Sequence, residues 1–181
     1  MSNEDEPVTG IETPIYLNYN FTAGLAPARF LQQVKRGVLT GQRCPRCAQV
    51  YIPARGSCPA CGIPTEEEVR LPDKGTVQSF TIVSIPIPNN PIEPPFVIAN
   101  LVLDGANISF IHLMSECVNE EVHIGQRVQA VWKPEAEWDY AMDNIRYFKP
   151  LDEPDVPVAW IGRVPVTGPP AGGLATDGRE G

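Results

Sequence analysis

The chain has 181 residues, of which 43% are hydrophobic, and a formal net charge of −8. This length suits one domain or two small ones. No apolar run reaches the roughly 18 residues of a membrane-spanning helix, so the sequence predicts no membrane protein. The acidic start, MSNEDEPVTG, has no apolar leader core, which favours a cytoplasmic protein with reduced cysteines.

The charges are unevenly distributed. Residues 13–65 contain 6 basic and no acidic residues, whereas residues 66–150 contain 13 acidic and 6 basic residues. A basic segment is thus joined to an acidic one. The basic side chains are either solvated surface charge, or they face an anion or an acidic protein surface.

Residues 1–24 are predicted to be mostly irregular, with IYLNYNF as an extended segment that docks on a partner or on the core. The next stretch, APARFLQQVKRG, predicts a short amphipathic helix that stops at Gly37. Phe30, Leu31 and Val34 share one face of this helix, and we predict that this face contacts a partner unless it caps the neighbouring module.

Four of the five cysteines form two Cys-x-x-Cys pairs with ten residues between them: Cys44, Cys47, Cys58 and Cys61. Ten residues allow a hairpin that brings the pairs together, and four thiolates form a closed structural zinc site. Iron would fit the same four sulfurs. A thioredoxin-like redox pair would need a βαβ pattern, which is missing. Residues 25–65 are therefore predicted to be a helix and a rubredoxin-like zinc ribbon.

Residues 66–150 have a different texture. Five strand-like runs follow one another: GTVQSFTIVSI, PFVIANLVLD, NISFIHLM, QRVQAVWKP and NIRYFKP. Five short strands predict a five-stranded OB-fold barrel, with a helical turn in ECVNEEVHIG. Residues 151–181 are rich in proline and glycine and predict an irregular, disordered tail. The fold class is thus mainly β.

The residues offer little for catalysis. His112 lies in SFIHLM, where a place in the barrel wall is expected, and His123 is expected to be exposed. Cys117 is expected to be a small buried hydrophobe. No nucleophile elbow, phosphate loop or dinucleotide fingerprint is present in the sequence. We therefore expect the chain to do no chemistry on its own.

The order of these motifs resembles a known family. A short helix, a CPxC…CPxC ribbon, GTVQSFTIV, an apolar strand into LDG, IGQRVQAVW and a closing IRYFKP are similar to proteins that couple a rubredoxin-like zinc ribbon to an OB-fold. The resemblance covers about residues 25–150. Ala48 departs from the family pattern, which usually has glycine at this position of the first turn.

The resemblance implies a non-catalytic accessory subunit of a thiolase-fold acyl-CoA enzyme. Two stretches, YNFTAGLAPARFLQQVKRG and VWKPEAEWDYAMDNIRYFKP, look like the branch that accompanies lipid-transfer-protein-type aldolases of steroid side-chain degradation. Subunits of ketothiolase or hydroxymethylglutaryl-CoA synthase assemblies are the alternative. In such assemblies the zinc-ribbon subunit stabilises the catalytic subunit and can border the CoA site.

CoA carries phosphates that basic side chains would hold. The candidates are Lys35, Arg36, Arg43, Arg46 and Arg55. The rival interpretation is single-stranded nucleic-acid binding, because ribbons and OB-folds both serve it. Residues 66–150 carry a net charge of −7, however, and phosphate neutralisation dominates such binding. The sequence therefore predicts a protein partner and no nucleic acid.

Overall fold

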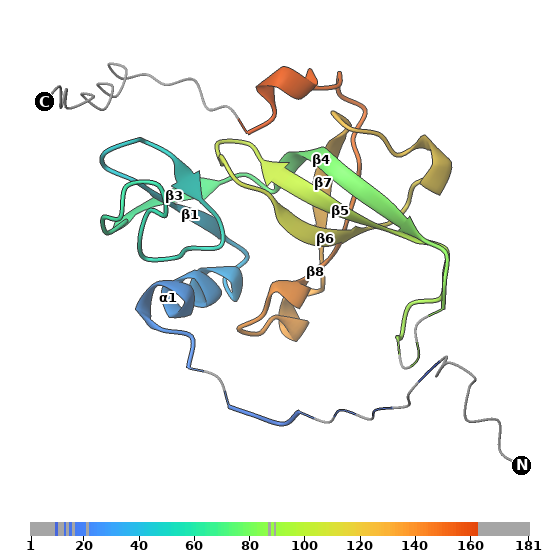
Figure 1. Ribbon diagram of the computed structural model, residues 1–181, viewed down its shortest axis with the longest axis horizontal. Coiled ribbons are helices and arrows are strands. Elements are labelled where there is room, and N and C mark those ends of the chain that lie inside the picture. Colours follow the sequence, from blue (N-terminus) through green and yellow to red (C-terminus); the bar gives the residue numbers. More distant parts are fainter. Residues whose placement is uncertain are drawn as a thin grey trace, which may run out of the picture.

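A computed structural model describes residues 10, 13, 15, 17–20, 22–86, 88 and 90–162 (Figure 1). It contains one α-helix, a three-stranded sheet and a barrel. The elements are α1 (Leu25–Val34), β1 (Leu39–Arg43), β2 (Val50–Tyr51), β3 (Glu67–Leu71), β4 (Lys74–Val83), β5 (Phe96–Leu103), β6 (Phe110–Met114), β7 (Arg127–Trp132) and β8 (Ile145–Pro150). No described helix has the length and apolar character that crossing a membrane requires.

The barrel confirms the predicted OB-fold. Its strands close in the order β4–β5–β6–β8–β7, and β7 returns to β4. Four of the five contacts between strands are antiparallel, while β6 and β8 meet in parallel through the single pair Met114 and Phe148. The predicted helical turn between the third and fourth barrel strands is a 3₁₀-helix, Asn119–Glu121.

The ribbon sheet contains one strand that the sequence did not predict. β1 pairs with β2 on one side and with β3 on the other, both antiparallel. β3 begins within a run of three glutamates, residues 66–68, whose composition is typical of solvated surface and not of a strand. It lies at the edge of the sheet, where Glu67 and Glu68 are exposed, Leu71 is buried, and Glu67 accepts a hydrogen bond from Arg43 at 3.2 Å. The strand that pairs with β3 is therefore β1 of the ribbon sheet and not a strand of the barrel.

Helix α1 lies against the ribbon sheet (Figure 1). Phe30 and Val34 are 3% and 0% exposed and share one core with residues of β1, β3 and the barrel. The turn after α1 contains Gly37, whose φ of +70° lies in the left-handed region that favours glycine. A Cβ at Gly37 would stand 2.5 Å from Trp138, so the β7–β8 connection closes tightly over the helix end.

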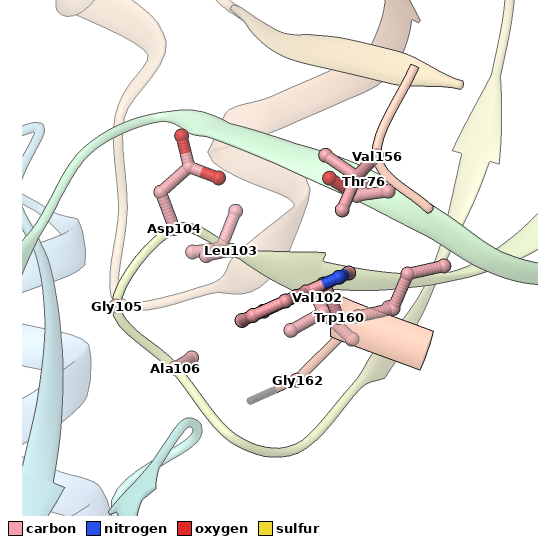
Figure 2. A pocket seen from close by; sticks show the side chains of 10 residues that line it. Thr76, Val102, Leu103, Asp104, Gly105, Ala106, Val156, Trp160 and Gly162 are labelled. Atoms are coloured by element: carbon pink, nitrogen blue, oxygen red, sulfur yellow. The ribbon is translucent and has the colours of Figure 1, made fainter. Parts of the chain in front are cut away.

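The segment 151–162 forms a strap across the barrel. Arg127, which is 8% exposed, donates to both carboxylate oxygens of Asp104 at 2.6 Å and to Glu153 of the strap at 3.1 Å. Farther along, a cavity of about 150 Å³ separates the strap from β4 and β5, and Figure 2 shows Trp160 beside Val102 there. This part of the predicted tail thus packs on the barrel, while residues 163–181 lie outside the described range.

We predict that Arg127→Lys lowers the free energy of unfolding by about 2 kcal/mol. A lysine carries the charge but not the planar fork that spans Asp104, so the buried donors would be mismatched. Denaturant unfolding followed by circular dichroism measures the loss. The exposed Arg146→Lys serves as control and should change stability by less than about 0.5 kcal/mol. Equal effects of the two substitutions would contradict the role of Arg127.

Candidate metal centre

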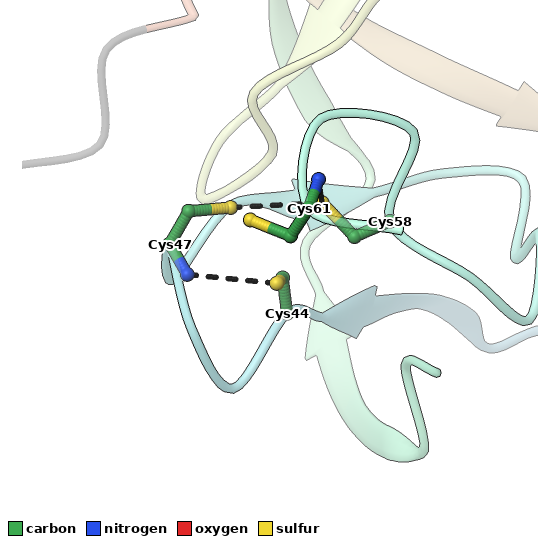
Figure 3. A group of neighbouring side chains, drawn as sticks. All are labelled: Cys44, Cys47, Cys58 and Cys61. Atoms are coloured by element: carbon green, nitrogen blue, oxygen red, sulfur yellow. Dashed lines mark hydrogen bonds between the residues drawn. The ribbon is translucent and has the colours of Figure 1, made fainter. Parts of the chain in front are cut away.

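The four predicted cysteines converge in the ribbon (Figure 3). Their sulfurs all lie within 4.8 Å of one another, and those of Cys47 and Cys58 are 3.7 Å apart. Zinc–sulfur bonds of about 2.3 Å in a tetrahedron place neighbouring sulfurs about 3.8 Å apart. The cluster therefore has the size of a four-thiolate zinc site.

Two similar backbone turns aim the sulfurs at this point. In the first turn the amide of Ala48 donates to the carbonyl of Cys44 at 2.9 Å, and in the second the amide of Gly62 donates to the carbonyl of Cys58 at 2.8 Å. The amides of Cys47 and Cys61 also point at the sulfurs of Cys44 and Cys58, at 3.5 and 3.3 Å. Donors of this kind stabilise thiolate ligands.

Ala48 occupies a position where glycine is favoured. Its φ is +60°, close to the +68° of Gly62 at the equivalent place in the second turn. A left-handed conformation costs an ordinary residue about 1–2 kcal/mol. The departure from the family pattern seen in the sequence is thus a local strain that leaves the four sulfurs in place.

A hydroxyl that sequence reasoning missed completes the surroundings of the sulfurs. The Tyr51 hydroxyl lies 3.2 Å from the sulfur of Cys58 and 2.6 Å from the side-chain oxygen of Gln49, and either atom can accept its single proton. The pKa of Cys58 is lowered to about 6, and the largest cause is the hydrogen bond from the Tyr51 hydroxyl. Burial raises the pKa of Cys61 to about 12, and the other sulfurs add to the shift. Full ionisation of the cluster therefore requires a cation.

The predicted anion-binding residues do not form one cluster. Lys35, after the last turn of α1, lies 3.5 Å from Asp139 and over the ring of Tyr140. Arg43 faces Glu67 across the ribbon sheet. Arg55 lines a cavity of about 840 Å³ at the other end of α1. A helix of this length spans about 15 Å, so Lys35 and Arg55 do not share one phosphate.

The two remaining candidates, Arg36 and Arg46, are exposed. Within the described residues neither they nor Arg55 form an ion pair, so their charges face solvent.

The helix face predicted to contact a partner is used inside the chain. Phe30 and Val34 are buried in the shared core, and Leu31 is half-buried against it. Of the two outcomes expected for this face, packing on the neighbouring module is the one observed for Phe30 and Val34. Their side chains therefore present no surface to another protein.

Two amide side chains connect the ribbon and helix to the barrel. Asn107, between β5 and β6, accepts from the Val50 amide at 2.7 Å and donates to the carbonyl of Gly162 at 2.9 Å. Asn144, which is 0% exposed, donates to the carbonyls of Val34 and Asp139. Sequence reasoning identified neither residue, because an asparagine in a connecting segment carries no pattern.

The histidines and Cys117 lie apart from the metal site. The His112 ring lies in the barrel near Phe110 and Phe148, and burial lowers its pKa. His123 is exposed and hydrogen-bonded to Asp155 of the strap at 2.8 Å. Cys117 is half-buried against the core, so it is less buried than expected.

A closed zinc ribbon joined to an OB-fold barrel is the class of protein that these observations define. The ChsH2 rubredoxin-like zinc ribbon domain matches residues 32–67, and the ChsH2 C-terminal OB-fold domain matches residues 68–133. A DUF35 domain-containing scaffold protein of Methanocaldococcus jannaschii is 35% identical over 122 residues, which are 65% of this chain and 85% of the relative. The chain belongs to this family of ChsH2-like, DUF35 zinc-ribbon and OB-fold proteins.

Other similar proteins share this architecture. A second DUF35 scaffold protein, from Methanothermobacter thermautotrophicus, is 29% identical over 97 residues, covering 52% of this chain and 71% of the relative. A chain of the solved structure titled Ltp2-ChsH2(DUF35) aldolase has a TM-score of 0.54 at 24% identity, covering 70% of this chain and 95% of that one. The solved structure of a DUF35 protein from Sulfolobus solfataricus has a TM-score of 0.50 at 19% identity, covering 67% of this chain and 81% of that one. At these identities the two structures show the shared fold.

The family match and the sulfur geometry together identify the metal as structural zinc. We predict that the purified, reduced protein contains about one zinc ion per chain. Cys44→Ser or Cys61→Ser should lower the zinc content to less than about half an ion per chain and unfold the ribbon. Ligation of this kind contributes on the order of 10 kcal/mol to folding. Elemental analysis with circular dichroism is the measurement. Cys117→Ser is the control and should keep its zinc; stoichiometric iron in place of zinc would contradict the assignment.

Ala48→Gly should stabilise the zinc-bound protein by about 0.5–1 kcal/mol. Glycine removes the left-handed strain, and the greater freedom of the unfolded chain offsets part of that gain. The matched reverse change, Gly62→Ala, should destabilise by about 1 kcal/mol. Denaturant unfolding at saturating zinc compares the two. A lower stability of Ala48→Gly would show that this turn is not strained.

Proposed function

We propose that this chain is a non-catalytic accessory subunit of a thiolase-fold acyl-CoA enzyme, specifically a retro-aldolase that cleaves a steroid side-chain acyl-CoA. The observation that carries the proposal is membership of a family whose relative at 35% identity is named a scaffold protein. The structural neighbour titled Ltp2-ChsH2(DUF35) aldolase supports the choice of an aldolase assembly. The partner would carry the catalytic groups.

The metal centre supports a structural role for this subunit. Four cysteine sulfurs fill the coordination of a tetrahedral zinc, so no position is left for water or substrate. The zinc instead holds the two turns and the strands between them in one geometry. A rigid ribbon is what a scaffold would present to another subunit.

The exposed basic side chains support a place at the edge of the CoA site. Arg36, Arg46 and Arg55 project from a segment without acidic residues between 13 and 65. Lys35 and Arg43, already beside Asp139 and Glu67, would contribute less. Charges at such a rim act mainly on the association rate and its salt dependence. The proposed role is therefore attraction of the CoA phosphates, with the acyl end bound by the partner.

The test is purification of the native assembly at low salt, identification of the partner, and assay of the separated and recombined subunits. We expect the partner to catalyse carbon–carbon bond cleavage in the acyl-CoA. Adding this chain should raise the stability or the turnover of the partner. Arg36→Glu with Arg55→Glu should raise the KM for acyl-CoA about three- to tenfold, an effect that added salt reduces.

Two controls separate this role from its rivals. Gln32→Glu, also at an exposed position, should leave the KM unchanged. A condensing partner would instead favour a ketothiolase or hydroxymethylglutaryl-CoA synthase assembly. Turnover by the isolated chain that depends on His112 or His123, or a micromolar, salt-sensitive complex with single-stranded DNA, would contradict the proposal.

A further inference from the structure

The chain carries an exposed apolar segment ahead of α1, here called the arm and defined by the described residues 15 and 17–20. Ile15, Leu17 and Tyr19 are 74%, 77% and 78% exposed. In the sequence they alternate with Tyr16, Asn18 and Asn20, so an extended backbone places the three large side chains on one face and the two asparagines on the other. Burying an Ile, Leu or Tyr side chain is worth several times the thermal energy, so three exposed together mark a contact surface.

Among the residues that the structure describes, none buries the side chains of Ile15, Leu17 and Tyr19. In Figure 1 residues 17–20, drawn in blue, lie apart from α1 and the ribbon in an extended course. Its connection to the helix is Gly24, whose φ is +78° and around which no atom would meet an added Cβ within 4 Å. The arm is therefore attached through an open, glycine-containing joint that allows it to take its direction from what it binds.

The absence of charge narrows the class of binding partner. Residues 13–28 contain no acidic and no basic residue. Binding to nucleic acid depends on phosphate neutralisation, and binding of a short segment to an anionic membrane surface depends on lysine and arginine. An uncharged segment with large apolar side chains at positions 15, 17 and 19 fits a protein surface instead.

A second copy of this chain is a poor acceptor. β3 is a free edge of the ribbon sheet, and its exposed Glu67, Glu68 and Arg70 are the kind of side chains that prevent edge pairing. The opposite edge is β2, which is only two residues long and whose Val50 exchanges hydrogen bonds with Asn107. The described ribbon therefore offers the arm no suitable edge.

We propose that the arm adds as a β-strand to an open sheet edge of the catalytic partner. This inference rests on the proposed function and names how the partner is held. Main-chain hydrogen bonds would give affinity, and a row of apolar pockets about 7 Å apart would take Ile15, Leu17 and Tyr19. The two asparagines would face solvent.

The experiment uses the full-length chain and the catalytic subunit identified in its native assembly. Replacing Ile15, Leu17 and Tyr19 together by serine should weaken the complex at least about 100-fold, because three buried side chains are lost. The matched control, Asn18→Ser with Asn20→Ser, changes the other face and should stay within about threefold of the wild type. Both variants should keep zinc and stability, since the arm lies outside the core.

Hydrogen exchange by NMR tests the strand itself. Amides of the arm should exchange at the rates of a free peptide in the isolated chain and become protected at every second residue in the complex. Unchanged affinity of the triple variant, protection of the arm in the isolated chain, or dimerisation of the chain through the arm would overturn the inference.

The outcomes separate this inference from the proposed function. A thiolase-fold partner bound equally well by the triple variant would uphold the function and overturn the arm. A partner of another fold that is lost in the triple variant, with alternating protection, would uphold the arm and overturn the function. A chain that forms no complex with any subunit of its native host would overturn both.

Discussion

The bond between one metal ion and four sulfurs is the interaction on which the zinc ribbon depends. The two turns that carry the cysteines have almost no side-chain core of their own: Cys44, Tyr51 and Cys58 are buried together, with Cys47, Cys61, Ile63 and Ile108 packed against them. The β2 strand of the ribbon has two residues. So small a module buries too little apolar surface to offset the entropy of ordering its loops. The metal supplies the missing free energy and fixes both turns at once.

The ribbon is nevertheless not an independent unit. Ile108, which packs beside the cysteines, comes from the same β5–β6 connection as Asn107. At the far end of α1, Asn144 caps a helix carbonyl from the β7–β8 connection. Two barrel loops thus reach across to the N-terminal half, and the shared core of Phe30, Val34 and barrel residues lies between them. A subunit that binds the ribbon therefore also meets a surface whose position the barrel sets.

What the sequence predicted, and what it did not, follows from the range of the interactions concerned. The barrel strands and the four cysteines were predicted because runs of β-branched and aromatic residues and the spacing of metal ligands are local patterns. β3 was missed because an edge strand with two exposed glutamates resembles solvated surface until β1 lies beside it. The sequence predicted that α1 has an apolar face, but only the folded chain shows that Phe30 and Val34 on this face pack in the shared core.

The two turns of the metal site have a consequence for its chemistry with reagents from solvent. In each Cys-x-x-Cys pair the first sulfur is buried and the second is half-buried, so Cys47 and Cys61 are the ligands that an oxidant or alkylating agent meets first. Cys58 is further protected, because its sulfur lies 3.2 Å from the hydroxyl of the buried Tyr51. Oxidative zinc release would begin at the second cysteine of each turn, and the buried pair would hold the ion last.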